Sequence, residues 1–90
     1  MSLSRTVAIV NERGLHARAS AKFVKLASGF DAQVTVSREG QSVDARSIMG
    51  LMMLAAGIGS TVDITAEGPQ ASQALEALTA LVAGRFDEER

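Results

Sequence analysis

The spacing of apolar residues changes repeatedly along this chain, and these changes limit the folds it can adopt. Val34 and Val36 alternate with polar residues, which is typical of a strand buried on one face. Ala71, Ala74 and Leu78 recur at helical spacing instead. The 90 residues are 47% hydrophobic but include no Trp or Tyr, so we expect one domain, residues 1–90, with a largely aliphatic core.

Taken in order, these patterns predict four strands and three helices. The predicted strands span residues 5–10, 32–38, 41–45 and 60–66. The predicted helices span residues 17–30, a short segment after Ser47, and residues 71–82. Glu39 and Gly40 favour a hairpin turn between the second and third strands. The order β-α-β-β-α-β-α indicates an α+β domain with a mainly antiparallel four-stranded sheet and three helices on one face.

The segment from Asn11 to Ser20 contains the only histidine, His16, where a strand pattern gives way to a helical one. The first N–H groups of a helix lack intrahelical partners and lie at the positive end of its dipole, so they can bind an anion. Imidazole is a nucleophile near neutral pH, and the Arg18 guanidinium follows two residues later. The pattern is compatible with a phosphoryl-binding site; an ordinary exposed loop histidine is the alternative, and it is the commoner case when only the local residues are considered.

The residues around His16 predict neither a metal site nor a cofactor site. The chain has no Cys and no second His, so zinc would need carboxylate ligands, and these show no recognisable spacing. Glu12 is the only carboxylate that the sequence places near His16, and we interpret it as a solvated loop residue. Because no second acid–base group is evident, we expect that the chain is not a self-contained enzyme.

Charge and composition argue against several other classes of protein. Nine basic and ten acidic residues give a formal net charge of −1, and neither a basic run nor aromatic stacking residues favour nucleic acid. No apolar run approaches the ~20 residues that cross a bilayer, and the first residues do not resemble a secretory signal. We therefore expect a cytoplasmic protein without membrane insertion.

The predicted short helix after Ser47, a favourable N-cap residue, is too apolar to bury all of its side chains. The positions expected to face inward are Leu51, Leu54 and Ala55. The positions then left exposed are Ile48, Met49 and Met52. Exposed Met and Ile side chains are typical of a protein contact surface. The alternative is a helix wedged between the sheet and another helix.

Polar residues near the other helices are expected to be solvated. Lys22 and Lys25 lie off the apolar stripe of the first helix and should face water. Phe86 is expected to be the last anchor of the chain, and residues 87–90 to form a frayed polar tail.

Two separated motifs add a more specific indication. They are Gly14-Leu15-His16-Ala17-Arg18 and Arg46-Ser47-Ile48-Met49-Gly50-Leu51-Met52. Together they resemble the HPr family, the histidine phosphocarrier proteins of the bacterial phosphoenolpyruvate-dependent phosphotransferase system. The resemblance extends over nearly the whole chain and implies an open-faced β-sandwich.

The resemblance also implies a role for each motif. His16 would accept a phosphoryl group on Nδ1 from phosphorylated enzyme I and pass it to a histidine of an enzyme IIA. Arg18 would stabilise the charge, and the N–H groups of Ala17 and Arg18 would bind the phosphate oxygens. The implied protein is a monomeric carrier that is a substrate of other enzymes. Its implied partner-binding surface consists of Ile48, Met49, Met52 and Lys25.

Ser47 matches the serine that, in some bacteria, is phosphorylated by a dedicated kinase, the HPr serine kinase/phosphorylase. Phosphate there would meet the favourable end of the helix dipole and add negative charge beside the docking surface. A plain helix cap accounts for Ser47 equally well. A second function therefore stays open, a regulatory binding module that signals mainly through Ser47 phosphorylation and the surface of Ile48, Met49 and Met52.

The sequence leaves the branch of the family open. Ala19 stands where many sugar-pathway members carry Pro, and Arg13 adds a second cation near the expected phosphate. Residues 29–32 and 68–70 look like the nitrogen-related branch, whereas residues 46–50 look like kinase-regulated members. Sugar transport and nitrogen regulation are both compatible with these residues.

Overall fold

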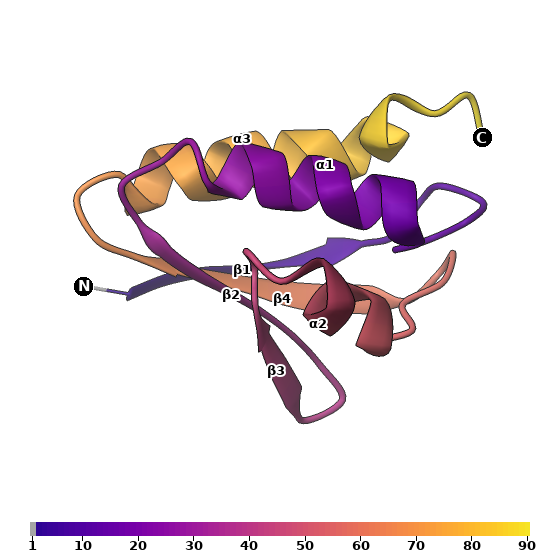
Figure 1. Ribbon diagram of the computed structural model, residues 1–90, viewed down its shortest axis with the longest axis horizontal. Coiled ribbons are helices and arrows are strands. Elements are labelled where there is room, and N and C mark those ends of the chain that lie inside the picture. The colour runs from indigo at the N-terminus through magenta and orange to yellow at the C-terminus, as the bar shows by residue number, and fades with distance from the viewer. Residues whose placement is uncertain (1) are drawn as a thin grey trace.

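The computed structural model describes residues 2–90, in which the predicted α+β class and element order are confirmed (Figure 1). The strands are β1 (Ser2–Ala8), β2 (Gln33–Arg38), β3 (Gln41–Asp44) and β4 (Thr61–Glu67). The helices are α1 (Ala17–Ala27), α2 (Ile48–Met53) and α3 (Ala71–Ala83), followed by the short 3₁₀ helix η1 (Arg85–Asp87).

The four strands form one sheet in the order β1-β4-β2-β3, and every neighbouring pair is antiparallel. The pairing of β1 with β4 runs from Ser2 opposite Glu67 to Ala8 opposite Thr61. The predicted hairpin of β2 and β3 is confirmed. Its turn includes Gly40, whose φ of 82° lies in the region that glycine adopts without strain.

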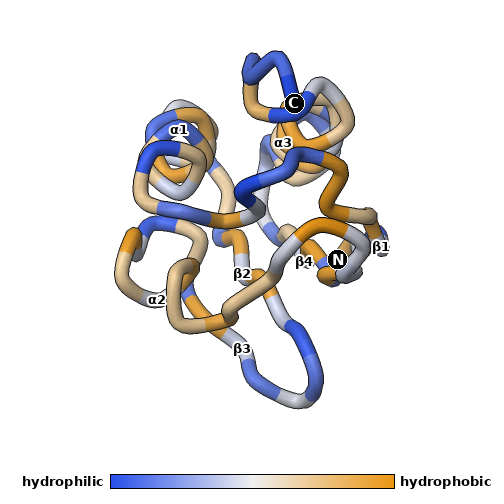
Figure 2. The backbone as a smooth tube through the Cα atoms, turned by 90° about the vertical axis from the view of Figure 1, so that its right-hand side faces the viewer, coloured by the Kyte–Doolittle hydropathy of each residue, from blue (hydrophilic) through white to orange (hydrophobic). Residues whose placement is uncertain are grey.

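The helices cover one face of the sheet, so the predicted open-faced architecture is confirmed. Figure 2 shows α1 and α3 side by side over the sheet, with α2 next to α1. The opposite face carries polar side chains: the hydroxyls of Ser4 and Thr65 are hydrogen-bonded at 3.2 Å, and Thr6 donates to Asp63. A polar face needs no further layer, which accounts for the open arrangement.

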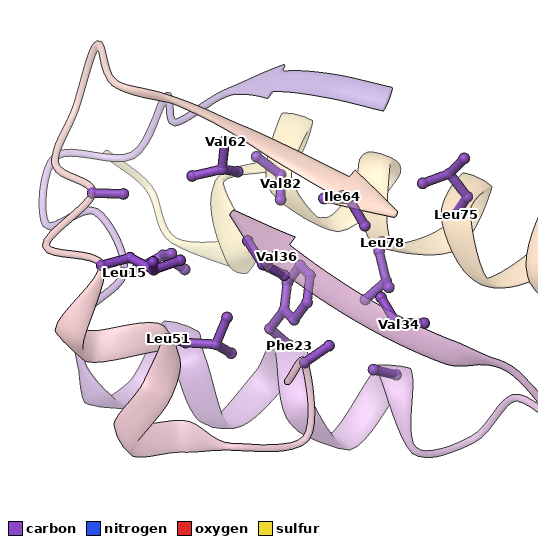
Figure 3. Packing of buried hydrophobic residues seen from close by; sticks show 14 of the residues in the cluster. Leu15, Phe23, Val34, Val36, Leu51, Val62, Ile64, Leu75, Leu78 and Val82 are labelled. Carbon is purple, nitrogen blue, oxygen red and sulfur yellow. The ribbon is translucent and has the colours of Figure 1, made fainter. Parts of the chain in front are cut away.

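The core lies between this sheet and the helices. Figure 3 shows the Phe23 ring directed from α1 toward Val36 of β2, with Leu51 of α2 nearby. Both valines predicted to point inward from β2 are buried. Other buried core residues are Val62, Ile64, Leu75, Leu78 and Val82. Burial of these side chains removes apolar surface from water and fixes α1 and α3 on the sheet.

The ends of two elements, β1 and α1, differ from the prediction by more than one residue because hydrogen bonding, not apolar spacing, sets them. β1 begins at Ser2 and ends at Ala8 instead of spanning 5–10, since its polar N-terminal residues still pair with β4. α1 ends at Ala27 instead of residue 30. Beyond it, the Gly29 and Phe30 N–H groups bond to carbonyls three residues back, which tightens the chain and closes the helix.

α2 leaves much of its apolar surface in solvent, as predicted, and the wedged alternative is wrong. Its exposed apolar side chains include Ile48 (40%), Met49 (70%) and Met52 (40%). Leu51 and Leu54 are buried, as expected. Ala55 was expected to point inward but is exposed, because the backbone turns to a φ of 53° there and leaves the helix.

The prediction of a frayed C-terminal tail is wrong. Phe86 is fully buried, as expected for an anchor, and its carbonyl accepts a hydrogen bond of 2.7 Å from Lys22 Nζ. Lys22 is therefore half-buried and does not simply face water. The Glu12 N–H donates to the Arg90 carbonyl at 3.0 Å. These contacts fold the tail back over the start of α1, at the right-hand end of Figure 1.

Gly14 is a position where the fold requires glycine. Its φ is +63°, and an added Cβ would lie 2.3 Å from the Ala56 carbonyl oxygen. We expect Gly14→Ala to lower the free energy of unfolding by at least ~2 kcal/mol through strain and this clash, measured by urea denaturation. Gly57→Ala is the matched control, because an added Cβ there has open space. Equal midpoints for the two variants would contradict the prediction.

Candidate functional site

His16 occupies the N-cap position of α1, with extended backbone angles and no side-chain capping bond. The Ser20 N–H donates to the His16 carbonyl at 2.9 Å, which closes the first turn of the helix. The N–H groups of residues 17–19 therefore precede the first intrahelical bond and are directed out of the helix end. The His16 side chain is 23% exposed, so the ring is neither fully buried nor free in solvent.

The loop before His16 is held by its own buried polar contacts. Asn11 is fully buried, and its Nδ2 donates to the Gly14 carbonyl at 2.9 Å. The Leu15 N–H donates to the Ala56 carbonyl at 3.0 Å. Because Leu15 itself is buried, the residue that precedes the histidine is fixed by both packing and hydrogen bonding.

The His16 ring contacts a carboxylate from the far end of the chain. Nε2 of His16 lies 2.5 Å from Oε2 of Glu88, and the other oxygen, Oε1, accepts a hydrogen bond of 3.0 Å from Asn11 Nδ2. Reversing the Asn11 amide would turn its oxygen toward two acceptors, so the observed orientation is the favourable one. Glu88 is therefore held from two sides.

Two opposing effects act on the Glu88 carboxyl group. Its burial tends to raise the pKa, whereas hydrogen bonds from Asn11 and His16 and the positive charges of His16 and Lys22 lower it. Together they place the pKa of Glu88 below its ordinary value. The group is thus a carboxylate at neutral pH and an acceptor for the histidine ring.

A shallow hollow beside this pair contains Arg18, which is exposed. The hollow is lined by Glu12, Arg13, Arg18, Glu88, Glu89 and Arg90. The structure thus brings Arg18 to the region next to His16, as the sequence predicted, and places Arg13 there as well. Guanidinium groups match the geometry and charge of phosphate oxygens.

A second hollow connects His16 to the apolar surface of α2, since both His16 and Met52 line it. Ile48 and Met49 continue this surface. Lys25, predicted to belong to the same partner-binding surface, is exposed on α1 but lines a different hollow with Leu26, Phe30 and others. Met52 of α2 thus lies beside the histidine, whereas Lys25 lies in a separate hollow.

Ser47 caps α2, as predicted. Its Oγ accepts a hydrogen bond of 2.9 Å from the Gly50 N–H. The side chain is half-buried and lies directly before the exposed Ile48. It is not part of either hollow beside the histidine.

Two observations on residues 2–90 concern metal sites and membrane-spanning helices. No group of three or more His, Cys, Asp or Glu side chains is arranged to hold a metal ion. None of the helices in this part of the chain combines the length and hydropathy needed to cross a membrane.

Comparison with known proteins decides the family. A family model described as the PTS HPr component phosphorylation site matches residues 3–84. The chain belongs to the HPr family. Phosphocarrier protein HPr of Cupriavidus necator is 58% identical to it over 86 residues, which cover 96% of this chain and 97% of that protein. Phosphocarrier protein NPr of Shewanella violacea is 45% identical over 86 residues, covering 96% and 94%.

A solved structure of the family agrees with the fold described above. The crystal structure of HPr-C-His from Thermoanaerobacter tengcongensis gives a TM-score of 0.93 at 41% identity, covering 98% of this chain and 99% of that one. The resemblance based on the two sequence motifs is thus confirmed. The family is one of phosphocarrier proteins of the phosphotransferase system.

Sequence reasoning missed two residues that lie beside the histidine of this HPr-family chain. Glu88 was assigned to a frayed tail, and Glu12 was taken as the only carboxylate near His16. Asn11 has no predicted role in the sequence analysis, although it is buried and bonds to Glu88. No local pattern marks Glu88; the anchor at Phe86 was the one available signal that the tail returns to the fold.

The lowered pKa of Glu88 predicts how stability depends on pH. Because the pKa of Glu88 is lower in the folded chain than the ordinary value of 4.5, ionised Glu88 contributes stability above that pH, and this contribution is lost as the pH falls through the folded value. We expect Glu88→Gln to be less stable than the unsubstituted chain at pH 7, with a difference that shrinks toward pH 3. Urea denaturation across this range measures the difference.

Glu89→Gln is the control, since Glu89 is exposed and adjacent. It should follow the unsubstituted chain at every pH. A Glu88→Gln difference that stays constant from pH 7 to pH 3 would contradict the assignment of the lowered pKa.

Proposed function

We propose that residues 1–90 act as one carrier domain that accepts a phosphoryl group on His16 from phosphorylated enzyme I and passes it to a histidine of an enzyme IIA. The observation that carries this proposal is the placement of His16 at the N-cap of α1, next to N–H groups that precede the first helical hydrogen bond. These donors suit an anion. Membership of the HPr family supplies the reaction class.

Nδ1 is the proposed phosphoryl acceptor. Nε2 of the ring is engaged by Glu88, so Nδ1 is the nitrogen left to react. A phosphoryl group on Nδ1 would gain charge stabilisation from Arg18 and hydrogen bonds from the Ala17 and Arg18 N–H groups. Phosphoryl transfer passes through a loose transition state, for which positioning and charge neutralisation matter more than covalent assistance.

The mixed charge of the adjacent hollow suits a carrier. Arg13, Arg18 and Arg90 attract a phosphoryl group, while Glu88 and other acidic residues in the same hollow oppose them. Binding that is equally strong in the ground state and the transition state would not speed transfer. A site that holds the group moderately can both receive it and release it.

Removal of the imidazole should abolish phosphorylation. With phosphoenolpyruvate and a cognate enzyme I, the unsubstituted chain should gain a single acid-labile phosphate, visible by mass spectrometry, because an N–P bond hydrolyses in acid. His16→Ala should gain none. Ser42→Ala, at an exposed position of β3 outside both hollows, keeps the imidazole, serves as the control and should be labelled like the unsubstituted chain. Equal labelling of His16→Ala and the unsubstituted chain would disprove the proposed acceptor.

The exposed side chains of Ile48, Met49 and Met52 form the proposed docking surface for enzyme I and enzyme IIA. Met52 lines a hollow together with His16, so a partner seated on α2 would reach the histidine. We include Lys25 as an outlying contact of the same partners, because it is exposed on α1.

A second candidate function is a regulatory binding module that signals through Ser47. The observation in its favour is the position of Ser47, half-buried at the N-cap of α2 and directly before the exposed Ile48. A phosphate on Oγ, added by a serine kinase/phosphorylase, would place about two negative charges beside an apolar docking surface. Partner binding would then require desolvation of that charge.

A charge at Ser47 should weaken docking without unfolding the chain. We expect Ser47→Asp to raise the Kd for enzyme I by about tenfold, or ~1.4 kcal/mol, in calorimetric titrations. Aspartate is also a good N-cap residue, so the fold should be retained. Ser42→Asp, at an exposed position of β3, is the matched control and should bind normally.

These titrations also separate the two functions. The carrier proposal predicts that His16→Ala binds enzyme I but is not phosphorylated. The regulatory module predicts that His16→Ala retains both target binding and signalling, whereas Ser47→Asp loses both. An unchanged affinity for Ser47→Asp would disprove the role of charge at this position.

A further inference from the structure

The contact between His16 and Glu88 is not accounted for by the proposed carrier function alone. The two residues are 72 positions apart in the chain, yet Nε2 lies 2.5 Å from Oε2. The Glu88 side chain is only 16% exposed, so the contact is largely shielded from water. A shielded, charge-assisted hydrogen bond is stronger and more specific than an exposed ion pair.

The C-terminal segment is built to bring Glu88 to this place. Arg85, Phe86 and Asp87 have consecutive φ values of 61°, 53° and 65°, a left-handed turn that non-glycine residues adopt at a cost. Full burial of Phe86 offsets that cost, and Lys22 bonds to its carbonyl. The Glu88 N–H donates to the Arg85 carbonyl at 2.9 Å, which closes the turn.

The carboxylate itself is oriented by a second buried group. Asn11 Nδ2 bonds to both Glu88 Oε1 and the Gly14 carbonyl, so it links the carboxylate to the loop that carries His16. Oε2 is thereby directed to the ring. This arrangement has the form of a base oriented by a carboxylate, in which the hydrogen bond selects one tautomer of the imidazole.

We propose that Glu88 is a positioning residue for His16: it accepts the Nε2–H hydrogen bond and so holds the ring in the tautomer whose Nδ1 carries the reactive lone pair. This inference rests on the proposed carrier function. It adds a role for a residue outside both sequence motifs. Glu88 contacts the ring at Nε2 and not at the attacking nitrogen, so this positioning role is exerted through the ring.

The proton on Nε2 is retained through the whole cycle. In the accepting step, the Nδ1 lone pair forms a bond to phosphorus while the bond from phosphorus to the donor atom of enzyme I breaks, and its electron pair stays on that donor. The ring becomes positively charged, and the Glu88 carboxylate stabilises this charge. In the donating step a ring nitrogen of the enzyme IIA histidine forms a bond to phosphorus while the N–P bond to His16 breaks, and the electron pair of that bond returns to the His16 ring, which leaves as neutral imidazole, still protonated on Nε2.

Other charged groups face this pair and must be kept constant in a test. Lys22 of α1 contributes positive charge near Glu88, and its Nζ also lies 4.0 Å from Asp87. The remaining charged groups, which line the hollow beside Glu88, are Glu12, Arg13, Arg18, Glu89 and Arg90. A substitution at Glu88 alone leaves all of them in place.

Two measurements on Glu88→Ala test the proposal. Heteronuclear NMR of the ring nitrogens, recorded where the imidazole is neutral, should show the Nε2–H form in the unsubstituted chain and a mixture of tautomers in Glu88→Ala. In steady-state assays with enzyme I, Glu88→Ala should lower kcat by roughly 10- to 100-fold, because the reacting nitrogen is misplaced or protonated. KM should change little, since the docking surface is intact.

Two further variants sharpen the result. Glu88→Gln keeps an acceptor oxygen but removes the charge, so it should retain the Nε2–H tautomer and lose less kcat than Glu88→Ala. With that oxygen on His16, Asn11 loses its bond to residue 88 but keeps its bond to the Gly14 carbonyl, and the nearly equal size of the side chain guards against a simple loss of fold. Glu76→Ala, which removes an exposed carboxylate of α3 outside both hollows, is the control and should behave like the unsubstituted chain in both measurements.

Three results would overturn the proposal: an unchanged tautomer distribution and kcat in Glu88→Ala, a change confined to KM, or a rise in kcat. The last would mean that the tail restrains the histidine instead of preparing it. Failure of the proposed carrier function would be distinct from failure of the positioning role, because the unsubstituted chain itself would then take up no phosphate on His16.

Discussion

The close approach of the Gly14 backbone to Ala56 is the constraint on which the site depends. Leu15 donates to the Ala56 carbonyl, and Gly14 leaves no space there for a side chain. This contact joins the loop before α1 to the segment after α2. The position of His16 is therefore set relative to the apolar surface of α2 by backbone atoms, which vary less in position than flexible side chains. A partner that docks on α2 meets the histidine at a defined place.

The electrostatic balance of the site follows from the return of the C-terminal segment. Without it, the start of α1 would present a helix dipole and arginine side chains, an environment that favours tight binding of anions. Glu88 and Glu89 bring negative charge into the same hollow. This balance of positive and negative charge suits a protein that transfers a phosphoryl group better than a protein that holds one tightly.

The predicted parts of the fold are those in which the spacing of hydrophobic residues directly reflects which side chains are buried. Val34 and Val36 alternate because β2 has one covered face, and the apolar positions of α3 repeat because the helix lies on the sheet. The start of β1 at Ser2 was not predictable in this way, since pairing with β4 supplies backbone hydrogen bonds whatever the side chains are. The same holds for Ala55, where a change in backbone angle ends the inward-facing pattern.

The candidate site likewise contains residues that could be located from the sequence and residues that could not. His16 and Arg18 are close in sequence and lie at a helix start, so local reasoning and the two motifs located them. Glu88 and Asn11 act through contacts that exist only after the chain has closed on itself. A polar tail shows no hydrophobic periodicity, so the sequence does not indicate where Glu88 lies. The position of Glu88 depends on the left-handed turn at Phe86.

The two ends of the described chain lie on opposite sides of the molecule, as Figure 1 shows. Arg90 is held at the rim of the hollow beside Arg18, whereas Ser2 begins the edge strand β1 far from it. Any affinity tag or fluorophore fused after Arg90 would thus emerge where partners of the proposed carrier function would approach. Attachment before Ser2 leaves that approach clear, a practical asymmetry for anyone who purifies, immobilises or labels this protein.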